Sequence, residues 1–278
     1  LGKGSLMTTM ISSRGCPYSC IFCGRPHLGK KFRARSSHNL VAEMKECLEL
    51  GINEFMIFDD FFTLERQRVL AICNLIIEQG LNISYAIRSR VDTVDKELLE
   101  ALKASGCQRI SYGIEAGNDT ILRNLKKGIT KKQALAAVKM TKDLGITVLA
   151  DFMLGYPGET KEQIKRTFDF AWEIEPDSVS FFIATPLPGS ELFQFCRENG
   201  FLVDDISSMD FKSYNMKIPK ESPYFNYSPE ELLQMVETKT REFNVWSKER
   251  NPDYWEQKYK LFLHKHPEQA EMILRRVT

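Results

Sequence analysis

Three cysteines near the start of the chain have the spacing of a metal site. Cys16, Cys20 and Cys23 follow one another as C-x3-C-x2-C, directly after the apolar, β-prone run 6–11. Thiolates at this spacing suit zinc or an iron–sulfur cluster, because one loop can wrap three ligands around one metal centre. A zinc site that only stabilises a fold usually has four protein ligands. A cubane cluster held by three thiolates instead leaves one iron open to a small molecule, so we expect reactive chemistry here.

Two other interpretations of these cysteines compete with a cluster. A disulfide fits poorly, because the cysteines on this tight loop are odd in number and no secretion signal precedes them. Zinc is the stronger alternative, because His27 follows Cys23 by four residues and could complete a Cys3His site. We interpret His27 instead as a surface or substrate-side residue. The remaining cysteines are interpreted as small buried hydrophobic residues: Cys47, Cys73, Cys107 and Cys196.

The bulk composition describes an ordinary globular chain. Of the 278 residues, 43% are hydrophobic and 27% charged, with a formal net charge of +1. This balance gives no electrostatic argument for binding nucleic acid or a membrane surface. No apolar run approaches the roughly 18 residues that a membrane span needs, and no secretory signal is visible. We therefore expect a reducing, cytoplasmic environment. The chain begins at Leu1 rather than at Met, which we interpret as a fragment of a longer protein.

Strand-like and helix-like patterns alternate over the first 200 residues. Six apolar runs are predicted as strands: 5–12, 54–58, 83–87, 109–114, 148–154 and 178–183. Helical patterns lie between them, one ending at Leu50 and the others covering 64–79, 95–105, 118–126, 130–144 and 160–173. Such alternation predicts parallel βα units. Right-handed crossovers make successive units curl the same way, into a barrel or an open wound sheet, and periodicity alone does not decide between them.

The pattern changes after Gly200. Residues 201–227 read as loop, without a convincing strand. Ser228 and the residues after it have the features of a helix start, and that helix is predicted to reach about Lys248. Residues 253–276 are predicted to be mostly helical, interrupted near Pro267. We expect this tail to be a small helical appendage or a cover for the open side of a barrel.

Polar residues gather where the predicted strands end. In barrels of parallel strands these ends meet at a common mouth, so the residues should lie close together. Both signs of charge are present, which suits a zwitterionic ligand such as an amino acid moiety. After the cysteine loop the set comprises Asp59, Asp60, Arg88, Arg90, Glu115, the turn 156–159 and the turn 185–189.

The sequence resembles the radical S-adenosylmethionine (SAM) superfamily. The resemblance rests first on C-x3-C-x-aromatic-C after the first strand, and it extends to about residue 200. It implies that Cys16, Cys20 and Cys23 hold a 4Fe–4S cluster, that SAM chelates the open iron, and that reductive cleavage of SAM yields a 5′-deoxyadenosyl radical. It also implies an α/β fold, a partial (β/α)6 TIM-type barrel open at the side, with a C-terminal helical extension.

The same resemblance implies roles for six further residues in binding SAM. Phe22 would pack near the adenine, and the backbone of Gly155 would meet it. Asp59 and Asp60 would contact the ammonium group, with helix capping by Asp60 or Thr63 as an alternative. Arg90 would pair with the carboxylate, Arg88 being the alternate candidate. Glu115, in Gly-Ile-Glu-Ala-Gly, would hold the ribose hydroxyls or the amino group, unless it forms an ion pair with a neighbouring arginine.

Features around the cysteine loop resemble members that carry a cobalamin-binding domain before the barrel. These are Ser-Arg-Gly before Cys16 and Asp-Asp-Phe-Phe-Thr from Asp59. We therefore expect a barrel over 1–200, an extension over 201–278 and an upstream cobalamin-binding domain outside this chain. The leading hypothesis is a methyltransferase or rearrangement enzyme acting on a small-molecule or natural-product-like substrate. Its electron donor would be a flavodoxin or ferredoxin. The alternative is a zinc- or cluster-stabilised binding domain without radical chemistry.

Overall fold

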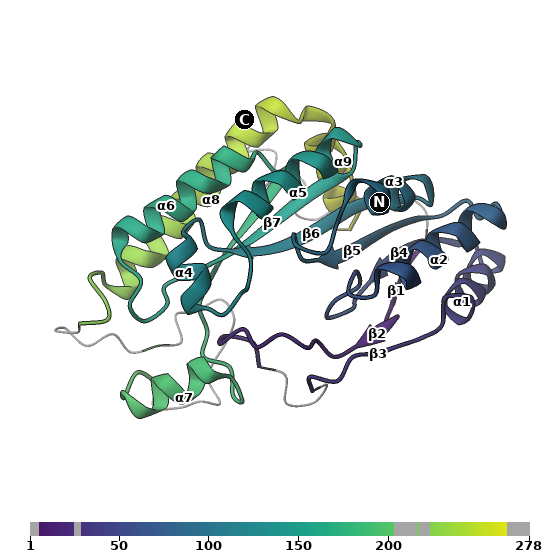
Figure 1. Ribbon diagram of the computed structural model, residues 1–278. Coiled ribbons are helices and arrows are strands. Elements are labelled where there is room, and N and C mark those ends of the chain that lie inside the picture. Colours follow the sequence, from purple (N-terminus) through teal and green to yellow (C-terminus); the bar gives the residue numbers. More distant parts are fainter. Residues whose placement is uncertain (1–5, 25–28, 203–215, 217–222, 266–278) are drawn as a thin grey trace.

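A single curved sheet organises the protein. The computed structural model describes residues 6–24, 29–202, 216 and 223–265. Six strands lie in the order β1-β4-β5-β6-β7-β8, and every neighbouring pair is parallel. Figure 1 shows the sheet curled into a half-barrel with helices along its convex face. The strands are β1 (Leu6–Met10), β4 (Ile52–Ile57), β5 (Ser84–Ser89), β6 (Cys107–Glu115), β7 (Thr147–Leu154) and β8 (Ser178–Ile183). The predicted partial α/β barrel is confirmed.

The helices connect successive strands and begin at residues suited to capping. Thr130 and Thr160 each form a capping box with a glutamine three residues later, and Asp95 accepts a hydrogen bond from the backbone of Leu98. The connecting helices are α1 (Ser37–Glu49), α2 (Arg66–Glu78), α3 (Lys96–Ala104), α4 (Asp119–Asn124), α5 (Lys131–Asp143) and α6 (Lys161–Ile174). The predicted helices are confirmed, with ends shifted by a few residues.

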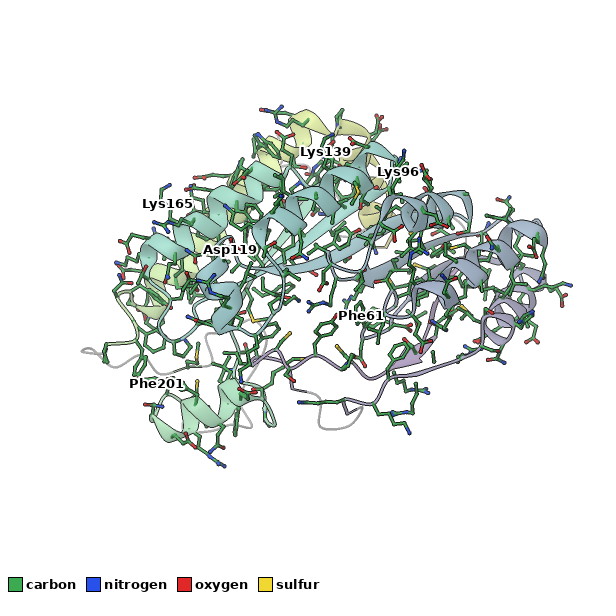
Figure 2. All side chains as sticks on the ribbon, viewed as in Figure 1. Phe61, Lys96, Asp119, Lys139, Lys165 and Phe201 are labelled. Atoms are coloured by element: carbon green, nitrogen blue, oxygen red, sulfur yellow. The ribbon has the colours of Figure 1, made fainter. Side chains whose placement is uncertain are left out.

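Burial alternates along the strands and gives each face a different role. On β7, Val148, Ala150, Phe152 and Leu154 are fully buried, while the residues between them are only half-buried. The buried set faces the helices and forms the core, and the other set faces the hollow of the half-barrel, because successive side chains of a strand point to opposite faces. The outer surfaces of the helices carry charged residues such as Lys96, Lys139 and Lys165 (Figure 2).

The C-terminal helices belong to the barrel wall. Helix α8 (Pro229–Arg250) packs along β8, and its Phe243 meets Trp172 of α6 at a ring-centroid distance of 5.1 Å. Helix α9 (Pro252–Lys265) is joined to α8 by a hydrogen bond of 2.9 Å from Trp255 Nε1 to Ser247 Oγ. Ser247 Oγ in turn donates to the carbonyl of Asp177, just before β8. Helix α8 thus covers the outer side of the last strand. The predicted helical stretch 266–276 lies outside the described residues.

Three short elements were not predicted. Strands β2 (Ser13–Arg14) and β3 (Arg33–Ala34) form an antiparallel pair that closes the base of the cysteine loop. Two-residue strands leave no periodic pattern to detect in the sequence. Helix α7 (Glu191–Glu198) lies away from the helical layer, beside the cysteine loop (Figure 1). In the part of the chain that the structure describes, no helix is long and apolar enough to cross a membrane.

Candidate active site at the cysteine loop

The cysteine loop is held in place by distant parts of the chain. Ile21 donates its N–H to the carbonyl of Leu125 at 3.1 Å, and its own carbonyl accepts from Leu192 at 2.9 Å. Gly15 stands at the start of the loop with φ +86°, and a Cβ there would lie 2.3 Å from the carbonyl oxygen of Lys31. Only glycine fits such a close approach in the left-handed region. The loop is therefore fixed at its start and at its middle.

All three cysteines of the loop line one cavity of about 320 Å³ between the loop and the strand ends. Its apolar walls include Phe61, which Figure 2 shows between the sheet and the loop. The predicted site residues that also line the cavity are Phe22, Asp60, Arg90 and Glu115, with the alternate candidate Arg88. Lining residues that were not predicted are Phe61, Ser89, Ser111, Gly113, Lys127, Asp151 and Phe182, and Tyr18 completes the set. The fold therefore brings most of the predicted set together.

Among the described residues, the three loop thiols do not form a compact site for a single metal ion. Cys16, Cys20 and Cys23 are half-buried and form no disulfide. Within residues 6–24, 29–202, 216 and 223–265, no three His, Cys, Asp or Glu side chains are close enough together to hold one metal ion. A cubane spreads its thiolate ligands farther apart than a single zinc ion, which holds each sulfur at about 2.3 Å. His27, the fourth ligand of the zinc alternative, lies outside the described residues.

Charges around Cys20 affect its protonation in opposite directions. Burial raises the pKa of the Cys20 thiol, while the positive charges of Lys127 and Arg90 lower it. Burial is the larger effect, so the thiol form is favoured when no metal is bound. A bound metal centre stabilises the thiolate directly, and the two nearby cations would add to that stabilisation.

The two adjacent aspartates after β4 hold the loop in different ways. Asp59 is 3% exposed and accepts three hydrogen bonds, from Ser12 N at 2.6 Å, Ser12 Oγ at 2.5 Å and Ser13 Oγ at 2.6 Å. Its carboxylate is thereby committed to the chain segment before the cysteines, and it does not line the cavity. Asp60 lines the cavity and accepts a hydrogen bond of 2.8 Å from Gly15 N. Asp59 thus supports the chain segment before the cysteines, and its contact with SAM stays a prediction.

Arg90 lines the cavity, but two of its three guanidinium nitrogens already have partners. Its Nε and Nη2 bond both carboxylate oxygens of Asp92 at 2.9 and 2.8 Å, and Nη2 also donates to the carbonyl of Lys127. The guanidinium stacks on the Tyr18 ring at 3.8 Å from its centroid. Arg90 therefore links the cysteine loop to the segment that carries Lys127. Arg88 lies over the Phe58 ring at 4.3 Å.

Glu115 forms an ion pair with a residue that was not predicted. Its Oε1 accepts a hydrogen bond of 2.7 Å from Lys127 Nζ, and the two side chains are only 10% and 8% exposed. The partner is a lysine, whereas the sequence suggested an arginine. Glu115 has φ +73°, and the pairing of β6 with β7 shifts its register between Gly113 and Glu115. Such a bulge redirects the side chain at a strand end toward the cavity.

Gly155 turns the chain at the end of β7. It has φ +85°, and its N–H donates to Glu159 Oε2 at 2.7 Å. The turn touches the cavity wall through Tyr156, whose ring lies 6.2 Å from that of Phe22. Gly155 itself does not line the cavity. The predicted contact of its backbone with adenine therefore stays a prediction.

Sequence reasoning missed Lys127 and Asp151 for different reasons. Lys127 follows a short helix rather than a strand, and only the fold brings it beside Glu115. Asp151 lies inside the run 148–154, which was predicted as a strand, and site residues were predicted only at the ends of strands. An acidic residue within an otherwise apolar strand was the available signal.

The comparisons with known proteins agree with this site. Residues 10–171 match the family model of the Radical SAM superfamily. An uncharacterized methyltransferase of Pyrococcus horikoshii is 36% identical over 207 residues, covering 74% of this chain and 44% of that protein. The cytidylyl-2-hydroxyethylphosphonate methyltransferase of Streptomyces wedmorensis is 30% identical over 253 residues, covering 87% of this chain and 46% of that protein. The chain thus spans less than half the length of these relatives.

Solved structures support the fold. The radical SAM methyltransferase TsrM from Kitasatospora setae, with cobalamin and a [4Fe-4S] cluster bound, superposes with a TM-score of 0.65 at 20% identity, covering 70% of this chain and 40% of that one. The cobalamin-dependent radical enzyme OxsB, with aqua-cobalamin and SAM bound, gives a TM-score of 0.64 at 17% identity, covering 97% of this chain and 49% of that one. The family match covers more than half of the chain and includes the cysteine loop and four of the six strands of the large sheet, β4 to β7. The chain belongs to the radical SAM superfamily, whose members use a 4Fe–4S cluster and SAM.

Proposed function

We propose that this chain is the cluster- and SAM-binding part of a methyltransferase-type radical SAM enzyme. The observation that carries the proposal is the single cavity lined by all three loop cysteines and by the Glu115–Lys127 ion pair. When bound, the cluster supplies the electron that cleaves SAM, and the hard chemistry belongs to the cofactor. The protein supplies ligands, orientation and exclusion of water.

Cys16, Cys20 and Cys23 would hold the cluster, and the opposite wall would hold SAM. The methionine part of SAM carries an ammonium and a carboxylate, which together with one open iron make a chelating group. Glu115 offers a partner for the ammonium and Lys127 a partner for the carboxylate, both in a largely buried pocket where charged hydrogen bonds are strong. Phe22 offers an aromatic face beside the loop. Arg90, bound to Asp92, would act by positioning Lys127.

The reaction class and the partners rest on similarity. The relative from Pyrococcus horikoshii and the one from Streptomyces wedmorensis are both named methyltransferases, which favours methyl transfer. Cobalamin in TsrM and OxsB supports a cobalamin-dependent reaction of the full-length protein. TsrM was also solved with tryptophan as substrate, which supports a small-molecule substrate here. An electron donor such as flavodoxin or ferredoxin completes the proposal.

Anaerobic reconstitution with iron and sulfide tests the cluster. We expect a 4Fe–4S signal in the electron paramagnetic resonance spectrum of the reduced protein, and a change of that signal on adding SAM. Replacing any of the three loop cysteines by alanine should abolish the signal. Cys47→Ala is the matched control, because Cys47 is a half-buried cysteine on α1 that does not line the cavity. A protein that retained zinc and formed no cluster would refute the proposal, and His27→Ala would then identify a Cys3His zinc site by loss of metal.

The adjacent lysines test the SAM pocket. Lys127→Met should weaken SAM binding by about tenfold, the loss of roughly one buried charged hydrogen bond. Lys126→Met is the control, because Lys126 pairs with Glu191 where both side chains are more than half exposed. Equal SAM affinities of the two variants would contradict the proposed role of Lys127. Analysis of the SAM-derived products would then distinguish methyl transfer from radical cleavage.

A further inference from the structure

Asp151 is an acidic residue inside the half-barrel. It lies deeper along its strand than the strand-end residues that would hold SAM. It lies in the middle of β7, three residues before the strand ends, which corresponds to about 10 Å along the strand. In the alternating burial of β7 it belongs to the half-buried set that faces the hollow, and it lines the cavity. A position in the apolar interior is costly for a carboxylate unless a partner compensates.

The surroundings of Asp151 offset the cost of its charge only in part. Across the sheet it is in register with Gly113 of β6 and Ser180 of β8, and Ser180 is its hydrogen-bond partner. The positive charges of Arg88 and Lys127 lower the pKa of Asp151, but less than burial and Glu115 raise it. Lys127 is bonded to Glu115, and Arg88 lies over the Phe58 ring.

Glu115 adds a second negative charge near Asp151. A Cβ on Gly113 would lie 2.7 Å from Glu115 Oε1 and 3.1 Å from Lys127 Nζ, so the Glu115–Lys127 ion pair lies directly beside Gly113. Gly113 is the residue of β6 that is in register with Asp151. Two acids, Asp151 and Glu115, therefore share this part of the cavity with Lys127 and Arg88. Burial raises the pKa of Asp151, and the charge of Glu115 raises it further. A bound cation would relieve both effects.

An apolar wall stands beside this acid. Phe182 follows Ser180 by two residues on β8 and therefore lies on the same face. Its side chain lines the cavity and is 50% exposed, so it is reachable from solvent. An aromatic or aliphatic body could pack on Phe182 while a charged group attached to it reaches the carboxylate.

We propose that Asp151 binds an amino group of the substrate, and that the apolar body of the substrate packs on Phe182. This inference rests on the proposed function, in which the loop side of the cavity holds the cluster and SAM. It identifies the substrate class as an amine with an apolar body, and it makes Asp151 a specificity-determining residue rather than a ligand of SAM.

Benzylamine and benzyl alcohol are suitable probes, because they share the ring and differ in the charged group. Both are titrated into the cluster-loaded, SAM-bound protein, with binding followed by saturation-transfer NMR. We expect Asp151→Asn to weaken benzylamine binding by about tenfold or more, as loss of a charge-assisted hydrogen bond does. The affinity for benzyl alcohol should change by less than about threefold in the same variant. Asp169→Asn, which removes an exposed acid of α6, should bind both probes like the wild type.

Phe182→Ala provides a second variant, since its half-exposed side chain can be truncated without opening the core. This substitution should weaken the binding of both probes to the same extent. The inference is overturned if benzylamine does not bind the wild type, if it binds the wild type and Asp151→Asn equally, or if both probes are lost together in Asp151→Asn. SAM affinity, measured separately, should be the same in wild type and Asp151→Asn. Failure of the wild type to bind SAM would overturn the proposed function instead, and the probe comparison in cluster-loaded protein without SAM would still decide the role of Asp151.

Discussion

Glu159 places a carboxyl group in the interior behind the turn at Gly155, and this predicts an unusual pH dependence of stability. The side chain is 1% exposed. Its Oε2 accepts the N–H of Gly155 at 2.7 Å, while Oε1 has no hydrogen-bond partner within the described residues. Burial raises the pKa of Glu159 from 4.5 to about 8. Near neutral pH the folded protein therefore keeps this carboxyl protonated, whereas the unfolded chain ionises it.

The direction of the pH effect follows from this difference in bound protons. Between pH 4.5 and about 8 the folded state holds one proton more than the unfolded state at this group. The free energy of unfolding then falls as pH rises, by up to about 1.4 kcal/mol per pH unit. From about pH 6 to about pH 8 we expect a loss of about 2 kcal/mol, because the slope flattens as the folded-state pKa is reached. Above that pKa the effect of Glu159 is constant.

Glu159→Gln isolates this contribution. A glutamine oxygen can accept the N–H of Gly155 as the carboxyl oxygen does, and it does not titrate. Urea unfolding of both proteins across this pH range gives the difference between their free energies of unfolding, in which the other titrating groups cancel. Between about pH 6 and pH 8, we expect the free energy of unfolding of the variant to rise by about 2 kcal/mol relative to that of the wild type.

Glu162→Gln is the control, because Glu162 is fully exposed on α6 and should leave the wild-type trend in place. Parallel pH profiles for the wild type and Glu159→Gln would refute the reasoning. They would mean that the buried carboxyl is ionised in the folded protein, and that the turn at Gly155 holds a charge.

Three further substitutions test how the site is held together. Asp59→Ala removes the acceptor of three buried hydrogen bonds. We expect urea unfolding to show a free energy of unfolding lower by about 3 kcal/mol, and reconstitution to give a lower iron content. Full iron content would contradict the supporting role of Asp59. Gly113→Ala would put a Cβ 2.7 Å from Glu115 Oε1, so SAM binding should weaken by about tenfold, measured by titrating the cluster signal. Gly117→Ala would put a Cβ 2.5 Å from the Cβ of Phe170 on α6, so urea unfolding should show a loss of about 2 kcal/mol, and an unchanged value would mean that α6 can shift freely.

The sequence predicts the βα units well because their signals are local and repeated, whereas the partial barrel was predicted from the family resemblance. Each βα unit combines an apolar run with a helical period, and a glycine usually ends the helix, as Gly145 does before β7. Parallel pairing of neighbouring strands then follows from the right-handed crossover. The α8 helix was predicted from its start at Ser228, where the structure has a capping box. Its position along β8 was not predictable, because an amphipathic pattern does not say which neighbour covers it.

The site was predictable at the level of residue types and only partly at the level of contacts. The cysteine spacing marks the loop without any knowledge of the fold. For Asp59 and Asp60 the sequence predicts only that two acids follow a strand, and adjacent residues of a strand end point in different directions. Which of the two is fully committed to supporting the loop depends on Ser12, which is 47 positions away from Asp59. Lys127 was missed for the same reason, since its ion pair with Glu115 depends on where a helix and a bulged strand meet.

Long-range contacts also determine how the cluster site can form. The loop with the cysteines has little regular structure of its own, and it is held by Asp59 after β4, by Leu125 after α4 and by Leu192 at the start of α7. Ordering such a loop costs conformational entropy, which these partners offset only once they are themselves folded. Three correctly spaced cysteines are therefore necessary but insufficient for a stable cluster. Iron content should therefore fall in Asp59→Ala, although Asp59 does not line the cavity. Leu125 and Leu192 act through backbone groups, which a change of side chain leaves in place.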